Sequence, residues 1–193
     1  MAASRHTDTA ERILDIAEKL VQQRGYNAFS YADIAAAMRI SKASIHHHFL
    51  AKADLAEQLI VRYHQHFVAA LAEIDQLPDP RKRLRRFVQV YLDVLRSDRM
   101  CLCGMLAAEI DSLPKPVRDE VRRFFTATED WLSRLLAAGR RAGTLAFTGS
   151  PDAEATLMVT ALEGAMLVAR SYGDVRHFEV VAERLLAGLG MAH

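Results

Sequence analysis

The stretch "FSYADIAAAMRISKASIHHHF", residues 29–49, is the most informative part of this chain, because it has the pattern of two short helices separated by a turn. Ser30 and Asp33 have the spacing of a capping box, which opens a helix that continues to about Met38. Ser41 caps a second, even shorter helix that carries three consecutive histidines. Two short helices joined by three or four residues are typical of a helix-turn-helix.

The remainder of the chain also has helical periodicity, and no alternation of polar and apolar residues is long enough to indicate a strand. Asp8 and Glu11 are spaced as a capping box for a first helix, and Gly25 has the position that ends it. Besides the two short helices above, we expect helices at about 8–24, 52–74, 81–97, 101–112, 116–141, 152–171 and 175–189. The sequence therefore predicts an all-α fold of three short helices followed by six mostly longer ones.

The bulk composition is that of a globular protein without a dominant charge. The 193 residues are 51% hydrophobic, which allows a sizeable core, and the net charge of +1 means that any nucleic-acid surface must be local. Cys101 and Cys103 are too few and too close for a disulfide framework, and the N-terminus lacks the apolar segment of a signal peptide. The most apolar run, 155–169, is too short to cross a bilayer and contains Glu163. We expect a soluble cytoplasmic protein with no membrane segment.

The histidines do not have the spacing of a metal site. Successive helical residues are rotated by about 100°, so His46, His47 and His48 spread over roughly 200° and cannot converge on one ion. His64 and His66, two residues apart, fail the same test. No nucleophile elbow, zinc-protease pattern, phosphate-binding loop or dinucleotide glycine pattern occurs either. We expect no metal, no cofactor and no enzymatic activity.

The helix pair presents an edge suited to a groove of DNA. We expect the apolar residues of the pair to pack against the first helix; these are Ile34, Ala35, Met38, Ile40, Ile45 and Phe49. The opposite edge of the second helix is small or hydrogen-bonding, and it consists of Lys42, Ala43, Ser44, His46 and His47. Such side chains allow a helix to enter the major groove, which is about 12 Å wide.

The block "RILDIAEKLVQQRGYNAFSYADIAAAMRISKASIHHHFLAKADL", residues 12–55, resembles the N-terminal domain of TetR/AcrR family transcriptional regulators. The matches follow in order and spacing: Arg24-Gly25-Tyr26, Ser30 with Ile34-Ala35, and then Ser41 through Leu55. The resemblance implies a three-helix helix-turn-helix DNA-binding domain at 1–50, and a six-helix ligand-binding and dimerisation domain at 51–193. The helix from about residue 52 would link the two.

The resemblance also assigns roles to single residues. Ser30, Tyr31, His46 and Lys52 would contact backbone phosphate, whereas Lys42, Ala43, Ser44 and His47 would approach base edges or the adjoining phosphates. His46 replaces the family's tyrosine, so its contact would depend on pH. Ala43 replaces a common glycine. Arg39 replaces the glycine of the turn, where a left-handed conformation is expected at some energetic cost.

The C-terminal part has features of a dimerisation and effector domain. The last two predicted helices are apolar on more than one face, so they could pair with a second copy as a four-helix bundle. In the family such a dimer sets two recognition helices roughly 34–36 Å apart, or a multiple of this, on a near-palindromic operator. Helices between 81 and 141 would help to enclose a small-molecule effector; candidate lining residues are Phe87, Tyr91, Cys101, Met105, Phe125, Trp131, Glu163, Met166 and Arg170.

We therefore expect a ligand-responsive repressor that binds double-stranded operator DNA as a homodimer and is released by a small-molecule inducer. Two alternatives remain open at this point. One is a metal-based or thiol-based redox or electrophile sensor on the same scaffold, since Arg96 and Arg99 could lower the pKa of a nearby cysteine. The other is a helical binding module that has lost DNA recognition.

Overall fold

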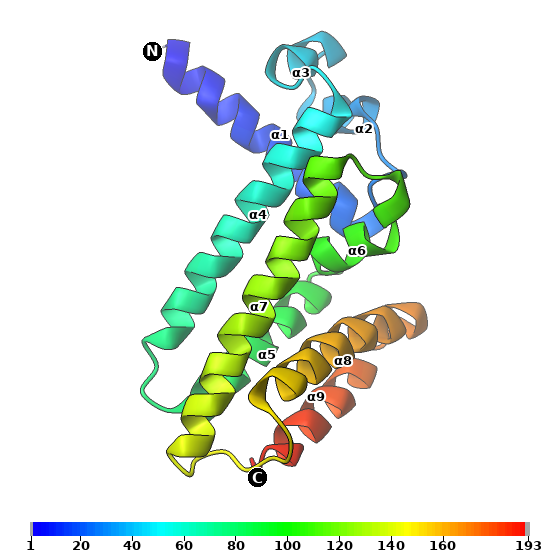
Figure 1. The fold of residues 1–193 in the computed structure, drawn as a ribbon. Coiled ribbons are helices and arrows are strands. Elements are labelled where there is room, and N and C mark those ends of the chain that lie inside the picture. Colours follow the sequence, from blue (N-terminus) through cyan, green and yellow to red (C-terminus); the bar gives the residue numbers. More distant parts are fainter. Residues whose placement is uncertain (1, 192–193) are drawn as a thin grey trace. The chain divides into compact units, whose positions relative to one another are not determined.

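The computed structural model describes residues 2–191, and all regular structure within them is helical (Figure 1). The elements are α1 (Ala2–Arg24), α2 (Tyr31–Met38), α3 (Lys42–His48), α4 (Lys52–Asp75), α5 (Pro80–Arg96), α6 (Leu102–Ala108), the 3-10 helix η1 (Ile110–Ser112), α7 (Lys115–Arg141), α8 (Pro151–Tyr172) and α9 (Arg176–Gly188). The all-α prediction is confirmed.

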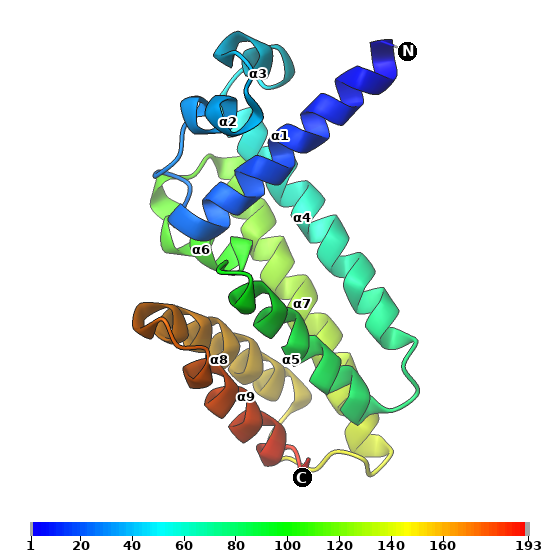
Figure 2. The same cartoon turned by 180° about the vertical axis from the view of Figure 1, so that it is seen from behind.

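The chain divides into two compact units that do not follow the sequence order. The first unit contains the residues up to Gln65 together with Leu102–Arg122, and the second contains His66–Cys101 and the residues from Arg123 onward. The chain thus passes between the units inside α4, at the start of α6 and inside α7. Residues 102–122 belong to the first unit because α6 packs against α1, as Figure 2 shows. The functional division at residue 50 stays a prediction.

The first unit is built on one face of α1. Ile13, Ala17 and Val21 recur at helical spacing and are almost fully buried, so they form the apolar stripe that α1 turns to the core. α2 packs against α1, and α3 packs against α2. α2 and α3 therefore form a pair that is held against α1 through α2.

Two predicted boundaries are wrong. α1 begins at Ala2 rather than near residue 8, so Asp8 and Glu11 lie inside the helix and form no capping box. The preceding residues contain neither glycine nor proline, and nothing stops the helix from extending. The predicted helix at 101–112 is also interrupted, because α6 ends at Ala108 and a separate turn of 3-10 helix follows.

The second unit contains the long helices that were expected, with their expected ends. Ser150 caps α8 by accepting a hydrogen bond from the Ala153 amide at 3.1 Å, and Gly173 ends the helix in the left-handed conformation. α8 and α9 lie side by side, and α5 packs against both. Phe87, Met166 and Phe178 are fully buried in this core. Within residues 2–191, no helix is both long and apolar enough for a bilayer.

Candidate functional site

The start of α2 is fixed by the capping box that the sequence predicted. The Ser30 hydroxyl accepts a hydrogen bond from the Ala32 amide at 3.2 Å, and the Asp33 carboxylate accepts one from the Ser30 amide at 2.7 Å. Hydrogen bonds from the Ser30 hydroxyl and amide lower the pKa of Asp33. Asp33 therefore stays ionised, and its carboxylate satisfies the Ser30 amide at the N-terminus of α2.

The turn between α2 and α3 adopts the left-handed conformation that was expected at Arg39, with φ of +57°. The Ile40 amide then bonds back to the Ala35 carbonyl at 3.1 Å, which closes the end of α2. A left-handed residue other than glycine costs roughly 1–2 kcal/mol. Ser41 offsets part of this cost by capping α3, since its hydroxyl accepts from the Ser44 amide at 3.1 Å.

As predicted, one face of the helix pair is buried and the opposite edge of α3 is exposed. Ile34, Ala35, Ile45 and Phe49 are buried, whereas Met38 and Ile40 are half-buried. The opposite edge of α3 is exposed along its length, with Lys42, Ala43, Ser44, His46 and His47 all open to solvent. A capped helix with a continuous exposed edge of small, cationic and hydrogen-bonding side chains is the geometry that a major groove accepts.

The His46 ring is held in one orientation. Its Nδ1 atom lies 3.2 Å from the Leu50 carbonyl oxygen, and its ring meets the Tyr31 ring edge-on at 4.8 Å. A carbonyl only accepts, so Nδ1 carries the hydrogen, and Nε2 becomes a donor only when the ring is protonated. A phosphate contact through Nε2 therefore requires a protonated His46.

Tyr31 has a role inside the helix pair. Its side chain is buried, and its hydroxyl donates to the Phe49 carbonyl oxygen at 3.0 Å. Burial, with a smaller contribution from Asp54, raises the pKa of Tyr31 to about 12. The hydroxyl thus links the start of α2 to the end of α3, and its predicted phosphate contact has no support from this placement.

The ammonium group of Lys52, at the start of α4, is also bonded within the protein. It donates to the Tyr26 carbonyl at 2.6 Å and to the Phe29 carbonyl, and it lies 4.5 Å and 4.2 Å from the centres of those two rings. Burial lowers the pKa of Lys52, and Glu109 partly opposes this. Lys52 therefore stabilises the loop between α1 and α2. The family resemblance had implied a contact with phosphate instead.

Glu109, which follows α6, holds the same loop from the other side. Its carboxylate accepts hydrogen bonds from the Tyr26 amide and, at 3.3 Å, from the Asn27 amide. The Asn27 side chain in turn donates to the Ser112 hydroxyl at 2.8 Å. Gly25 has a φ of +90°, which strains any residue with a Cβ, and a Cβ there would lie 2.9 Å from Glu109 Oε1, so the carboxylate would have to shift.

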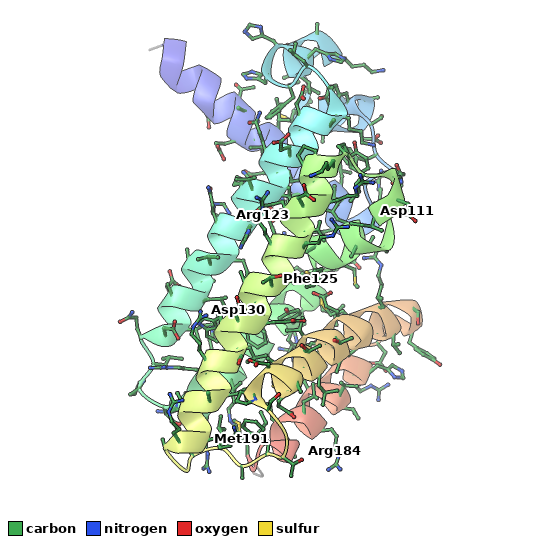
Figure 3. The ribbon with its side chains drawn as sticks, in the orientation of Figure 1. Asp111, Arg123, Phe125, Asp130, Arg184 and Met191 are labelled. Carbon is green, nitrogen blue, oxygen red and sulfur yellow. The ribbon has the colours of Figure 1, made fainter. Side chains whose placement is uncertain are left out.

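This role of Glu109 was not identified from the sequence. No local pattern could reveal it, because the bonded residues are 83 positions apart. Figure 3 labels Asp111, whose side chain is exposed on η1. The loop before α2 is thus held by two charged residues of opposite sign, Lys52 on its carbonyls and Glu109 on its amides.

Two family models match the chain. The model described as bacterial regulatory proteins, tetR family, matches residues 13–59, and the model described as the tetracyclin repressor-like C-terminal domain matches residues 80–185. The second alone covers more than half of the chain. This protein belongs to the TetR family of transcriptional regulators.

Similar TetR-family proteins have been named and solved. A TetR-family regulator from Agrobacterium tumefaciens is 37% identical, with a TM-score of 0.92 over 95% of this chain and 98% of that one. One from Legionella pneumophila is 33% identical, with a TM-score of 0.85 over 93% and 96% of the two chains. The HTH-type transcriptional repressor DhaR of Mycobacterium sp. (strain GP1) is 25% identical over 83% of this chain and 82% of its own.

Three of the aromatic residues proposed for the effector pocket of this TetR-family chain lie together. The Phe87 ring is 5.4 Å from the rings of both Tyr91 and Trp131, and all three side chains are buried in the second unit. Trp131 is fixed by a 3.0 Å hydrogen bond from its indole nitrogen to Asp75. The cluster therefore has the rigidity of a core, and effector contact by these rings stays a prediction.

Glu163 and Cys101 form a buried polar pair in the same unit. Burial raises the pKa of Glu163 well above its ordinary value, and the neighbouring Cys101 adds to this effect. Glu163 Oε1 is shielded from solvent and has no hydrogen-bond partner within the described part of the chain. Cys101 and Cys103 are both buried, and neither forms a disulfide within residues 2–191. Groups of three metal-binding side chains are absent from residues 2–191.

The other proposed effector residues are dispersed. Met166 is fully buried in the second unit, and Phe125 is half-buried with its ring edge-on to Phe124 at 5.4 Å. Met105 lies on α6 in the first unit, and its contact with an effector stays a prediction. Arg170 is exposed and lines a cavity at the ends of α5 and α8.

Proposed function

We propose that this protein is a transcriptional repressor that binds a near-palindromic operator as a homodimer and is released by a small-molecule effector. The observation that carries the proposal is the exposed edge of α3 on a capped helix pair. Repression is the part suggested by relatives, since DhaR and the BepR protein of Brucella suis biovar 1 (strain 1330) are both named repressors.

The proposed DNA contacts divide into two groups. Ser44 and His47 would hydrogen-bond to base edges with Ala43 packed between them, while Lys42, His46 and Ser30 would contact phosphates. Tyr31 and Lys52 would act indirectly, because their polar groups are bonded within the helix pair and its preceding loop. Their role would be to fix the angle at which α3 is presented.

An exposed apolar face on α8 and α9 supports the homodimer. Leu157, Leu167, Val168, Tyr172 and Val180 are between 47% and 69% exposed on these two helices. The two helices also border a groove of about 620 Å³ that Val168, Val180 and Val181 line. Exposed apolar side chains in this number are typical of an interaction surface, and two helices can complete a four-helix bundle with their copies.

The buried pair of Glu163 and Cys101 supports an effector site in the second unit. A neutral carboxyl with an unsatisfied oxygen costs free energy in a core, and an effector that supplies a hydrogen-bond donor would recover it. An effector that binds more tightly when the DNA-binding helices are in an arrangement that does not fit the operator would then weaken operator binding. Such coupling is typically about 1–3 kcal/mol, or roughly 5- to 150-fold in affinity.

The DNA-binding part is tested by nuclease footprinting on the region upstream of the protein's own gene. We expect one protected segment with approximate two-fold symmetry, and loss of protection when Ser44 and His47 are both replaced by alanine. A double variant that protects the same segment at the same concentration would contradict base contact by α3.

The dimer is tested by sedimentation of Leu167→Glu against the control Val68→Glu. Leu167 and Val68 are similarly exposed, at 51% and 45%, but Val68 belongs to α4 and not to the proposed face on α8 and α9. A charge buried in the interface should convert Leu167→Glu to a monomer while Val68→Glu stays dimeric. A dimer in both variants would place the interface elsewhere.

A further inference from the structure

Arg62, on α4, forms a bridge to α1 within the first unit, where the two helices cross (Figure 2). Its Nη1 atom donates to Glu11 Oε2 and to Asp15 Oδ1, each at 2.9 Å, and its Nη2 atom donates to Glu18 Oε2 at 3.2 Å. Nη1 also lies 3.4 Å from the Glu11 carbonyl oxygen. One guanidinium group thus binds three carboxylates of a single helix.

Helical spacing brings the partners of this bridge together. The three carboxylates are separated by four and then three residues, so they share one face of α1. On α4, Arg62 follows Leu55 and Leu59 with the same spacing, and both leucines are almost fully buried. The arginine therefore continues the apolar stripe of α4, and its guanidinium group reaches α1 at the end of that stripe.

The bridge is shielded from water at its centre. The Arg62 side chain is only 11% exposed, and Glu18 is the most buried of the three carboxylates at 20%. Burial would lower the pKa of Arg62, but its hydrogen bonds to Glu11 and Asp15 raise the pKa overall, so the group stays charged. Without this charge the three carboxylates would repel one another along α1, because like charges at these spacings destabilise a helix.

α4 holds the chain of α1 at a second point. Lys52 precedes Arg62 by ten residues, or roughly 15 Å along the axis of α4, and it bonds to two carbonyls of the loop that follows α1. A helix held at one point can pivot, whereas two separated points fix its direction. α2 packs against α1, and α3 packs against α2, so the direction of α1 determines that of the helix pair.

We infer that Arg62 is a positioning residue for operator recognition, which fixes the angle of α1 on α4 and, through α2, the presentation of α3. The inference rests on the proposed function, and Arg62 acts through α1 without touching DNA. Partly buried ion pairs are weak evidence for stability, because well-packed apolar residues often replace them without loss. The best-attested contribution of such groups is the selection of one arrangement.

The ratio of affinities for the operator and for an unrelated duplex of equal length, at equal salt, tests this role in the full-length protein. Arg62→Met keeps most of the apolar stem and removes the guanidinium group. A misdirected α3 loses base contacts but keeps phosphate contacts, so we expect the ratio to fall about tenfold or more. Arg12→Met is the control, since Arg12 is exposed on α1, and its ratio should equal that of the wild type.

A purely structural role of Arg62 predicts a different result. Partial unfolding would weaken binding to both duplexes equally and leave the ratio unchanged, and that result would overturn the inference. An equal fall in the ratio of Arg12→Met would overturn it as well. If Arg62→Met does not fold, Glu18→Gln removes one of the three carboxylate bonds and keeps the others. Its ratio should fall about threefold, and a wild-type ratio would then refute the role.

Hydrogen exchange of the protein without DNA distinguishes a failure of this inference from a failure of the proposed function. In Arg62→Met the amides of residues 15–22 should exchange about tenfold faster or more, while those of α9 keep their wild-type rates. Unchanged exchange in α1 would refute the bridge, whatever the protein does with DNA. Equal affinity of the wild type for both duplexes would instead contradict the proposed function, and the positioning role would fail with it.

Discussion

Replacing Lys52 by methionine tests how the DNA-binding helices are positioned. Methionine keeps most of the apolar stem but removes the ammonium, which donates to the Tyr26 and Phe29 carbonyls. The loop from Gly25 to Phe29 would then be held only by the bonds of its amides to Glu109 and of Asn27 to Ser112. We expect this loop to open far more often while the helices around it remain folded.

The size of the effect follows from the two bonds. A hydrogen bond from a charged donor contributes about 1.5–3 kcal/mol. Lys52 is half-buried, so water can partly replace it on the carbonyls, and the two losses together should amount to about 2–4 kcal/mol. With each 1.4 kcal/mol equal to a factor of ten, opening should become roughly 30- to 1,000-fold more frequent.

Hydrogen exchange of the Tyr26 and Asn27 amides measures this opening, because both amides are bonded only while the loop is closed. Lys42→Met is the matched control, since Lys42 is exposed on α3, and exchange in the loop should not change. Unchanged exchange in Lys52→Met would refute the positioning role. If the salt dependence of DNA binding also fell by about 0.9 in slope, Lys52 would instead be a phosphate contact.

Three further changes have defined outcomes. Gly25→Ala should lower the free energy of unfolding by about 1–2 kcal/mol in urea, because φ is +90° and the new Cβ meets Glu109; an unchanged midpoint would be inconsistent with that contact. Lys42→Ala should reduce the slope of log affinity against log salt by about 0.9, whereas an unchanged slope would remove Lys42 from the interface. Burial and Cys101 raise the pKa of Glu163, so its neutral form contributes stability that is complete below the ordinary value of 4.5 and is lost as pH rises through the folded pKa. The stability of Glu163→Gln relative to wild type should therefore increase in denaturation experiments as pH rises above 4.5; a pH-independent difference would contradict this.

Most of the fold could be predicted from local signals. Caps at Ser30 and Ser41 marked the starts of α2 and α3, because a side-chain oxygen must satisfy the first free amides of a helix. The start of α1 was misplaced, since Asp8 and Glu11 match the capping pattern without acting as caps. A capping pattern indicates a start only where the preceding residues cannot continue the helix.

The candidate site was predicted less completely, because its decisive contacts are long-range. The exposed edge of α3 followed from periodicity, but the roles of Lys52 and Tyr31 depend on carbonyls that the fold brings within reach. Glu109 gave no signal, since its partners lie on a loop before α2. The bridge from Arg62 to α1 depends on the crossing of α1 and α4, which neither helix encodes alone.

Hydrogen exchange of residues 41–49 with and without operator DNA tests the central claim most directly. The protein would be compared in the presence of its footprinted segment and of unrelated DNA of equal length at equal salt. We predict strong added protection in 41–49 with the operator and much weaker protection with the unrelated duplex. Equal protection by the two duplexes, or none in 41–49, would contradict recognition of DNA through the exposed edge of α3.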